Sequence, residues 1–211
     1  GKTSAELFAS KGYTVFEISR HGQSTQNICH ITADITDHES INEAINQILA
    51  TAGRIDILIN NAGFGISGAI EFTDIKDAKS FYGMTKSLGE INNNYNLTLR
   101  TSIIGPDNNK NGIGLFKWFM ESSKSVNGYK NVFWSGVTTL ELSKSIEKAI
   151  IDNLSGLYHV TNNKKISKYD LLNLFKKEFN KDIDIIPFND VTCDKSFINT
   201  STYNFKIPSY E

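Results

Sequence analysis

The sequence contains few of the residues that mark specialised classes of protein. Its two cysteines, Cys29 and Cys193, lie far apart and form no paired motif, so neither a disulfide framework nor a cysteine-bound zinc is expected. Proline occurs only 3 times in 211 residues, and no repeat or low-complexity segment appears. The net charge of -1 provides no basic surface for nucleic acid. No apolar run is long enough to span a membrane, and no signal-peptide pattern opens the chain.

These absences favour a reduced, cytoplasmic protein that binds neither nucleic acid nor membranes. At 211 residues with 39% hydrophobic composition, the chain is long enough for one domain with a sizeable core. The four histidines have no metal-like spacing, so we expect no metal site and assign them no functional role: His21, His30, His38 and His159.

Helical and strand patterns alternate along the chain and indicate an α/β protein. Apolar residues recur at helical spacing in residues 4–11, 37–53, 82–93, 112–125, 138–152 and 167–180. Short β-branched and aromatic runs predict strands in residues 13–19, 28–36, 55–63, 97–105, 131–136, 156–161 and 182–187. The tail from Asn189 shows weak periodicity and is expected to be irregular. This alternation is typical of parallel βαβ units, so we expect a mostly parallel sheet.

Polar residues follow three of the predicted strands in the first part of the chain. Arg20 follows the run at 13–19, Asp34 lies near the end of the run at 28–36, and Asn60–Gly63 follow the apolar residues of 55–59. Open parallel sheets bind ligands at the carboxyl ends of their strands, so these residues are candidates for one site. Taken alone, Arg20 could equally be a solvated charge, and Asp34 could be a turn or cap residue.

The run ADITD at 33–37, the helix after it and GRIDILINNAG at 53–63 resemble the short-chain dehydrogenase/reductase superfamily. Residues 1–73 resemble its short, single-domain branch. The resemblance implies a Rossmann-like fold and binding of NADP, with NAD possible. It also implies the following cofactor-binding residues: Gly1 as the last glycine of the phosphate loop, Arg20 at the 2′-phosphate, Asp34 and Ile35 at the adenine, and Asn61, Ala62 and Gly63 in the turn that holds the sheet near the cofactor.

A second candidate feature is the run SFYGMTKSLGE, residues 80–90. Tyr82 and Lys86 are four residues apart, so both would project from one face of a helix. A free tyrosine has a pKa near 10, and a neighbouring ammonium lowers it towards useful acid–base chemistry. The spacing alone also occurs by chance on many surface helices.

This run and NLTLRTSIIGP, residues 96–106, resemble the extended branch of the superfamily, most closely dTDP-4-dehydrorhamnose reductases and related nucleotide-sugar reductases. The second resemblance covers residues 79–211. It implies that Tyr82 is the catalytic acid and that Lys86 is its partner and a ribose ligand. It also implies that Arg100 and Thr101 contact the substrate, and that the chain ends in a small substrate-side lobe.

The two resemblances meet at an unusual junction. Only 20 residues separate Asn61 from Tyr82, where both branches have a longer segment. We therefore expect a Rossmann-like sheet without its usual first strand and one central strand, as in a truncated splice of two reductases. We read residues 1–73 as the cofactor-binding half and residues 74–211 as the remainder of one domain. We assign the third catalytic role to neither Ser67 nor Ser80, because neither follows a recognisable strand.

Two functions are compatible with these sequence features. The first is an NAD(P)-dependent oxidoreductase that reduces a carbonyl, such as the 4-keto group of a nucleotide-activated sugar. The second is a non-catalytic Rossmann-like remnant or a nucleotide-sugar-binding protein. In either case exposed sheet edges would favour a homo-oligomer.

Overall fold

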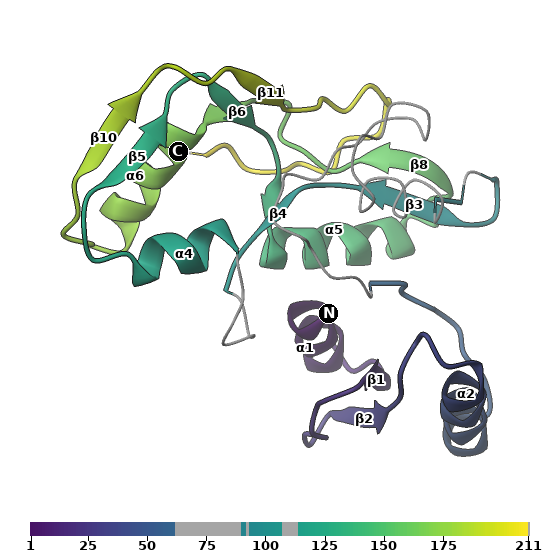
Figure 1. Ribbon diagram of the computed structural model, residues 1–211. Helices are drawn as coiled ribbons and strands as arrows, with labels where there is room; N and C mark the ends of the chain where they lie inside the picture. The colour runs from purple at the N-terminus through teal and green to yellow at the C-terminus, as the bar shows by residue number, and fades with distance from the viewer. Residues whose placement is uncertain (62–89, 92, 107–113, 211) are drawn as a thin grey trace. The chain divides into compact units, whose positions relative to one another are not determined.

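The computed structural model describes residues 1–61, 90–91, 93–106 and 114–210 (Figure 1). The chain divides into two compact units, Gly1–Phe64 and Gly65–Glu211, and each is considered by itself. The expected border between residues 73 and 74 lies outside the described residues, as does most of the expected helix from Tyr82. None of the described helices combines the length and the hydropathy that crossing a bilayer would require.

The first unit contains two helices and two strands. Helix α1 spans Lys2–Ser10, β1 spans Val15–Ser19, β2 spans Ile28–Thr32 and α2 spans His38–Ala52. Strands β1 and β2 pair in parallel, with Val15 opposite Ile28 and Ser19 opposite Thr32. All four elements match the helix and strand patterns of the sequence. The described elements therefore run helix, strand, strand, helix. The predicted strand–helix–strand unit is not formed by them, because no helix lies between β1 and β2 and no strand is formed in residues 55–61.

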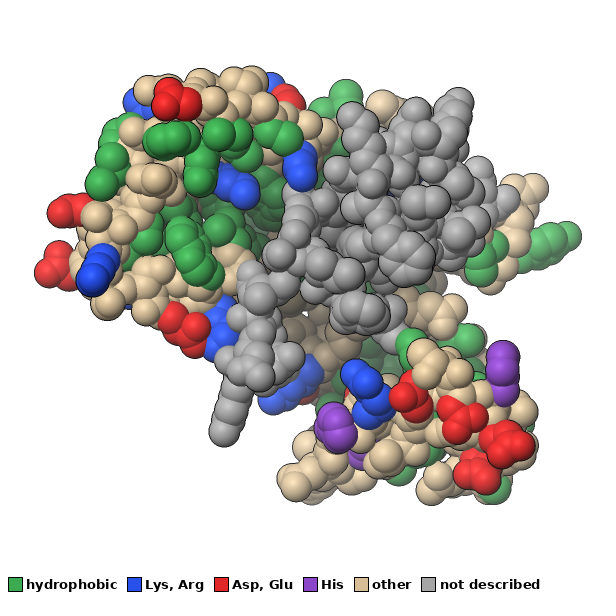
Figure 2. Space-filling model, in the orientation of Figure 1, with side chains coloured by type: hydrophobic (Ala, Val, Ile, Leu, Met, Phe, Trp, Pro, Cys, Tyr) green, Lys and Arg blue, Asp and Glu red, His purple; other side chains and the backbone are tan. Residues whose placement is uncertain are grey.

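Helix α2 is defined at both ends by its own residues. The Asp37 side chain accepts a hydrogen bond of 3.0 Å from the backbone N–H of Glu39, and Gly53 ends the helix in a left-handed conformation. The buried face carries Ala44 and Ile48, which pack against Ile31 of β2. Figure 2 shows acidic side chains gathered over α2, as expected for the solvent side of an amphipathic helix.

The expected strand at residues 55–63 is wrong for its described part, residues 55–61. These residues form no strand, and the apolar side chains in this run are exposed. Leu58 is 72% exposed, and Ile55, Ile57 and Ile59 are each at least 40% exposed. The physical reason is the lack of a ladder partner. In the usual order of a doubly wound sheet, this strand pairs with the first strand, and no described residue of the unit provides that strand.

This difference gives a direct test by substitution. Ile48→Ala removes a side chain that is 6% exposed and should lower the free energy of unfolding by about 2–5 kcal/mol. Leu58→Ala removes a side chain that already contacts water and should change it by no more than about 0.5 kcal/mol. Urea denaturation of both variants measures the difference. An equal loss in the two variants would mean that Leu58 is packed in a sheet after all.

The second unit contains three described helices and several short strands (Figure 1). The helices are α4 (Leu115–Glu121), α5 (Thr139–Ile151) and α6 (Lys168–Glu178). The strands are β3 (Leu97–Arg100), β4 (Ile103–Ile104), β5 (Val126–Tyr129), β6 (Val132–Trp134), β7 (Val137–Thr138), β8 (Gly156–His159), β9 (Ile166–Ser167), β10 (Ile185–Phe188) and β11 (Cys193–Lys195).

The strands of this unit pair in small groups. Parallel pairs join β3 with β8, β4 with β7, and β5 with β10. Strand β6 pairs in parallel with β11 and antiparallel with β9. The described ladders of the chain are therefore parallel with one exception, which confirms the α/β class and the mostly parallel pairing. They form separate small groups in place of the single sheet that the patterns predict.

The run at residues 97–105 forms two strands where the sequence predicts one. Strand β3 ends at Arg100, whose carbonyl accepts a hydrogen bond from the N–H of Val160 after β8. Two residues later the carbonyl of Ser102 accepts from the N–H of Val137, so the ladder passes to β7. The chain changes partner between these two bonds, a tertiary event that residue pattern alone does not encode.

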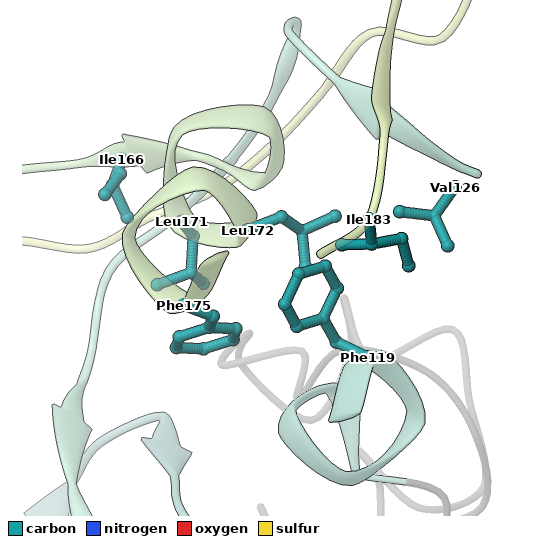
Figure 3. Packing of buried hydrophobic residues seen from close by; sticks show 7 residues of the cluster. All are labelled: Phe119, Val126, Ile166, Leu171, Leu172, Phe175 and Ile183. Carbon is teal, nitrogen blue, oxygen red and sulfur yellow. The ribbon is translucent and has the colours of Figure 1, made fainter. Parts of the chain in front are cut away.

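Aromatic and aliphatic side chains from α4, α6 and their neighbouring strands form the main core of this unit (Figure 3). Phe119 of α4 is fully buried, and Leu172 of α6 is 1% exposed. Phe175 of α6 lies 5.9 Å from Phe119 between ring centroids. Burial of such side chains stabilises a fold by about 1.5–3 kcal/mol each, so this cluster holds α6 against β5 and β10.

The C-terminal tail is more ordered than its weak periodicity predicts. Strand β11 pairs with β6, and the buried Ser135 hydroxyl donates to the Phe197 carbonyl at 3.0 Å. The Tyr210 hydroxyl accepts from the N–H of Gly136 at 3.0 Å, and burial raises the pKa of this phenol. The tail is therefore part of the fold of this unit, held by contacts to residues more than 60 positions away.

One carboxylate of the tail makes stability depend on pH. Hydrogen bonds from Lys165, and then from Ser196, lower the pKa of Asp194 from 3.8 to about 2. A depressed carboxyl pKa stabilises the fold above the unfolded value and ceases to do so as pH falls through the folded value. Because the Asp194 side chain is 46% exposed, solvent screening limits the effect to about 1 kcal/mol or less.

The matched variant Asp194→Asn removes this titration. We expect the wild-type chain to be slightly more stable than the variant at about pH 6, and the difference to shrink towards about pH 2. Urea denaturation at both pH values measures it. A difference that stays constant across this range would show that Asp194 titrates normally.

Candidate cofactor site

The carboxyl ends of β1 and β2 bring two of the predicted site residues to one end of the first unit. Arg20 directly follows β1, and Asp34 follows β2 by two residues. Because the strands are parallel, both positions lie at the same end of the ladder. The positive charge of Arg20 makes a small contribution to the lowered pKa of Asp34.

The Asp34 carboxylate is held in a fixed orientation. Its Oδ1 accepts hydrogen bonds from the backbone N–H of Thr36 at 2.9 Å and from the Thr36 hydroxyl at 2.8 Å. These bonds, with a smaller contribution from Arg20, lower the pKa of Asp34. Oδ2 makes no hydrogen bond among the described residues, so it is available to accept one from a ligand. Ile35 beside it is 55% exposed and offers an apolar surface.

Gly1 and Asn61 also lie together. A Cβ atom at Gly1 would lie 3.2 Å from Nδ2 of Asn61, closer than most real contacts of a Cβ. Gly1 precedes α1, and no side chain caps the first N–H groups of that helix. Uncapped N–H groups at a helix N-terminus attract anions, phosphate included. The absence of a side chain at Gly1 therefore leaves space for an anion beside Asn61 at the start of α1, and a larger residue would fill this space.

Four predicted site residues lie outside the described part of the chain: Ala62, Gly63, Tyr82 and Lys86. The roles assigned to them by resemblance stay predictions. Among the described residues, no group of three or more His, Cys, Asp or Glu side chains could hold a metal ion.

The two predicted substrate residues of the second unit are engaged within the protein. Arg100 forms a two-pronged pair with Glu90, through Nε to Oε1 at 2.7 Å and through a terminal nitrogen to Oε2 at 2.6 Å. The Thr101 hydroxyl donates to the carbonyl of Val160 at 3.0 Å. A bidentate carboxylate satisfies the guanidinium edge that would otherwise bind a phosphate or a second carboxylate.

Sequence reasoning missed Glu90, and it assigned no role to His30, which pairs with Glu17. Both pairs join residues 10 to 13 positions apart in the chain, so no local spacing reveals them. Two hollows of the described second unit flank α6, the more enclosed of about 520 Å³, and neither is lined by a predicted site residue.

A double-mutant cycle tests whether Arg100 is committed to Glu90. Both side chains are largely buried, at 22% and 24% exposed, so Arg100→Met and Glu90→Gln should show a coupling free energy of about 1 kcal/mol. The unfolding free energies of the two single variants, the double variant and the wild type give this value. A coupling indistinguishable from zero would mean that Arg100 does not depend on Glu90 and is available to a substrate.

The first part of the chain is similar to known reductases. Residues 1–87 match the family model for short chain dehydrogenases. The 3-ketodihydrosphingosine reductase of Bacteroides thetaiotaomicron is 38% identical over 72 residues, which are 34% of this chain and 27% of that protein. A probable short-chain type dehydrogenase/reductase of Helicobacter pylori is 29% identical over 83 residues and is matched over 31% of its length. The chain thus spans about a third or less of these curated relatives.

Solved structures share the fold over most of the chain. A hypothetical dTDP-4-dehydrorhamnose reductase from Sulfolobus tokodaii has a TM-score of 0.67 at 19% identity, covering 97% of this chain and 86% of that one. The UDP-glucose 4-epimerase of Thermus thermophilus, solved with NAD, has a TM-score of 0.64 at 15% identity, covering 90% and 83%. At these identities the likeness defines the fold alone.

The chain is therefore a Rossmann-like α/β protein. Its residues 1–87 are similar to the short chain dehydrogenases. The resemblance read from ADITD and GRIDILINNAG is confirmed.

Proposed function

We propose that the chain is an NAD(P)-dependent oxidoreductase that reduces a carbonyl group, with the 4-keto group of a nucleotide-activated sugar as the substrate. The match of residues 1–87 to the short chain dehydrogenases supports the reaction class. The names of the structural neighbours, a dTDP-4-dehydrorhamnose reductase and a UDP-glucose 4-epimerase bound to NAD, support the cofactor and the substrate class.

The observation that carries the proposal is the set of polar groups at the carboxyl ends of β1 and β2. These groups fit the adenosine half of a dinucleotide. Asp34 presents an unused carboxylate oxygen for the adenine, and Arg20 at the same end of the ladder provides a fork of donors for a 2′-phosphate. Gly1 leaves room beside Asn61 for a pyrophosphate at the start of α1. The arginine favours NADP, because a free ribose diol is usually held by a carboxylate.

In this proposal Tyr82 and Lys86 carry out the proton transfer that accompanies the reduction. When bound, the cofactor supplies the hydride to the carbonyl carbon. Tyr82 donates its phenolic proton to the carbonyl oxygen as negative charge develops there. The Lys86 ammonium stabilises the phenolate that remains and is long enough to reach a ribose hydroxyl. Water or a neighbouring acid then returns the proton to the phenolate.

Two observations favour the alternative of a non-catalytic remnant or a nucleotide-sugar-binding protein. The apolar residues of 55–59 are exposed and do not join the described ladder of β1 and β2. The Arg100 guanidinium is paired with the Glu90 carboxylate. Under this alternative a second copy of the chain covers the exposed run, giving a homo-oligomer. A monomeric molar mass measured by light scattering would contradict the formation of this homo-oligomer.

Cofactor titration of Arg20→Ala tests the proposal. Loss of the charged fork should weaken NADPH about tenfold or more and leave NADH within about twofold, because only NADPH carries the 2′-phosphate. Cofactor fluorescence measures both affinities. Arg54→Ala is the matched control, since Arg54 is an exposed arginine of the same unit paired with Asp56, and it should bind as the wild type does. No response of the wild-type chain to millimolar NADPH would contradict the proposal.

A further inference from the structure

A pair of polar side chains lies beneath the loop that carries Arg20. Glu17 of β1 and His30 of β2 are register partners in the parallel ladder, so their side chains are neighbours on one face. The His30 Nδ1 atom lies 2.5 Å from Oε2 of Glu17, and the His30 side chain is only 7% exposed. The other ring nitrogen, Nε2, lies 3.1 Å from the hydroxyl of Thr32.

Both nitrogens of the imidazole are therefore engaged, and the ring orientation is fixed. A neutral ring that donates from Nδ1 to the carboxylate accepts at Nε2 from the Thr32 hydroxyl. Because the His30 ring is hydrogen-bonded on two sides and shielded from water, it is rigid. A backbone segment that packs against the ring is held in place by it.

The loop after β1 packs directly on this ring. A Cβ atom at Gly22 would lie 2.5 Å from Nδ1 of His30, closer than real Cβ atoms come, and 3.1 Å from Oε2 of Glu17. Gly22 thus rests its backbone against both members of the pair. Only a residue without a side chain permits this approach.

Two further bonds fix the same loop. The Ser24 hydroxyl accepts from the backbone N–H of His30 at 2.9 Å, and the Ser19 hydroxyl donates to the carbonyl of His21 at 3.1 Å. The segment from residue 19 to residue 24 is therefore fixed at its start, at Gly22 and at its end. Arg20 lies within this segment and is itself exposed.

We infer that Glu17 and His30 are positioning residues that hold the Arg20 loop in place to bind the 2′-phosphate of an adenosine nucleotide. The inference rests on the proposed cofactor site and names the pair that determines its preference for a 2′-phosphorylated nucleotide. Neither side chain touches the nucleotide. Each acts through Gly22.

The test uses two nucleotides that differ only in the presence of the 2′-phosphate, 2′,5′-ADP and 5′-AMP. In the whole chain, His30→Ala should weaken 2′,5′-ADP about tenfold and leave 5′-AMP within about twofold, measured by ³¹P NMR titration. His38→Ala is the matched control, because His38 is an exposed histidine of the same unit. It should change neither affinity.

Gly22→Ala provides a second variant that alters no member of the pair. Its added methyl group clashes with the imidazole and should displace the loop, with the same selective loss of 2′,5′-ADP affinity. Combining it with His30→Ala should cost no more than the larger single loss, because both changes act at one contact. Retained 5′-AMP binding shows that each variant is folded.

The outcomes separate the two proposals. If the wild-type chain prefers 2′,5′-ADP and the His30→Ala or Gly22→Ala variant keeps that preference, the positioning inference is wrong and the cofactor site stands. Equal weakening of both nucleotides likewise overturns the inference, since it reports only a structural role. If the wild-type chain binds neither nucleotide at millimolar concentration, both proposals are wrong.

Discussion

The parallel register of β1 and β2 is the constraint on which the structure of the first unit depends. Because both strands run in the same direction, Arg20 and Asp34 emerge at one end of the ladder. The same register sets Glu17 beside His30. Ile31, one residue further along β2, packs against Ala44 and Ile48 of α2. One ladder of five residue pairs thus positions the candidate site, its supporting pair and the core of the unit.

The run at residues 55–59 shows how the need for a pairing neighbour overrides the strand preference of a sequence. Its β-branched composition favours a strand, and the following Asn60 and Asn61 resemble the turn of a dinucleotide-binding protein. A strand is stable only when a neighbour satisfies its backbone N–H and C=O groups. No described strand of the unit takes that position, and Leu58 remains 72% exposed. Asn61 nevertheless lies against Gly1, so the turn residue reaches the helix start without the strand.

Helices with strong end signals could be predicted from the sequence with little error. Asp37 and Gly53 bound α2 as expected, and Ser167 caps α6 through the N–H of Asp170. Short strands could not, since β7 and β9 contain two residues each and have no period to detect. For the site, the family motifs indicated Arg20 and Asp34, because each closely follows a strand pattern. The partner of Arg100 and the pairing of His30 with Glu17 could not be found, because each depends on which elements meet in three dimensions.

The central claim is that the first unit binds the adenosine half of NADP at the carboxyl ends of β1 and β2. Backbone amide shifts in a ¹H–¹⁵N spectrum, followed during titration with NADP⁺, test it residue by residue. The account predicts shifts at Arg20, Asp34, Asn61 and the first turn of α1, with none along α6 of the second unit. Shifts confined to the second unit, or none at saturating nucleotide, would contradict it.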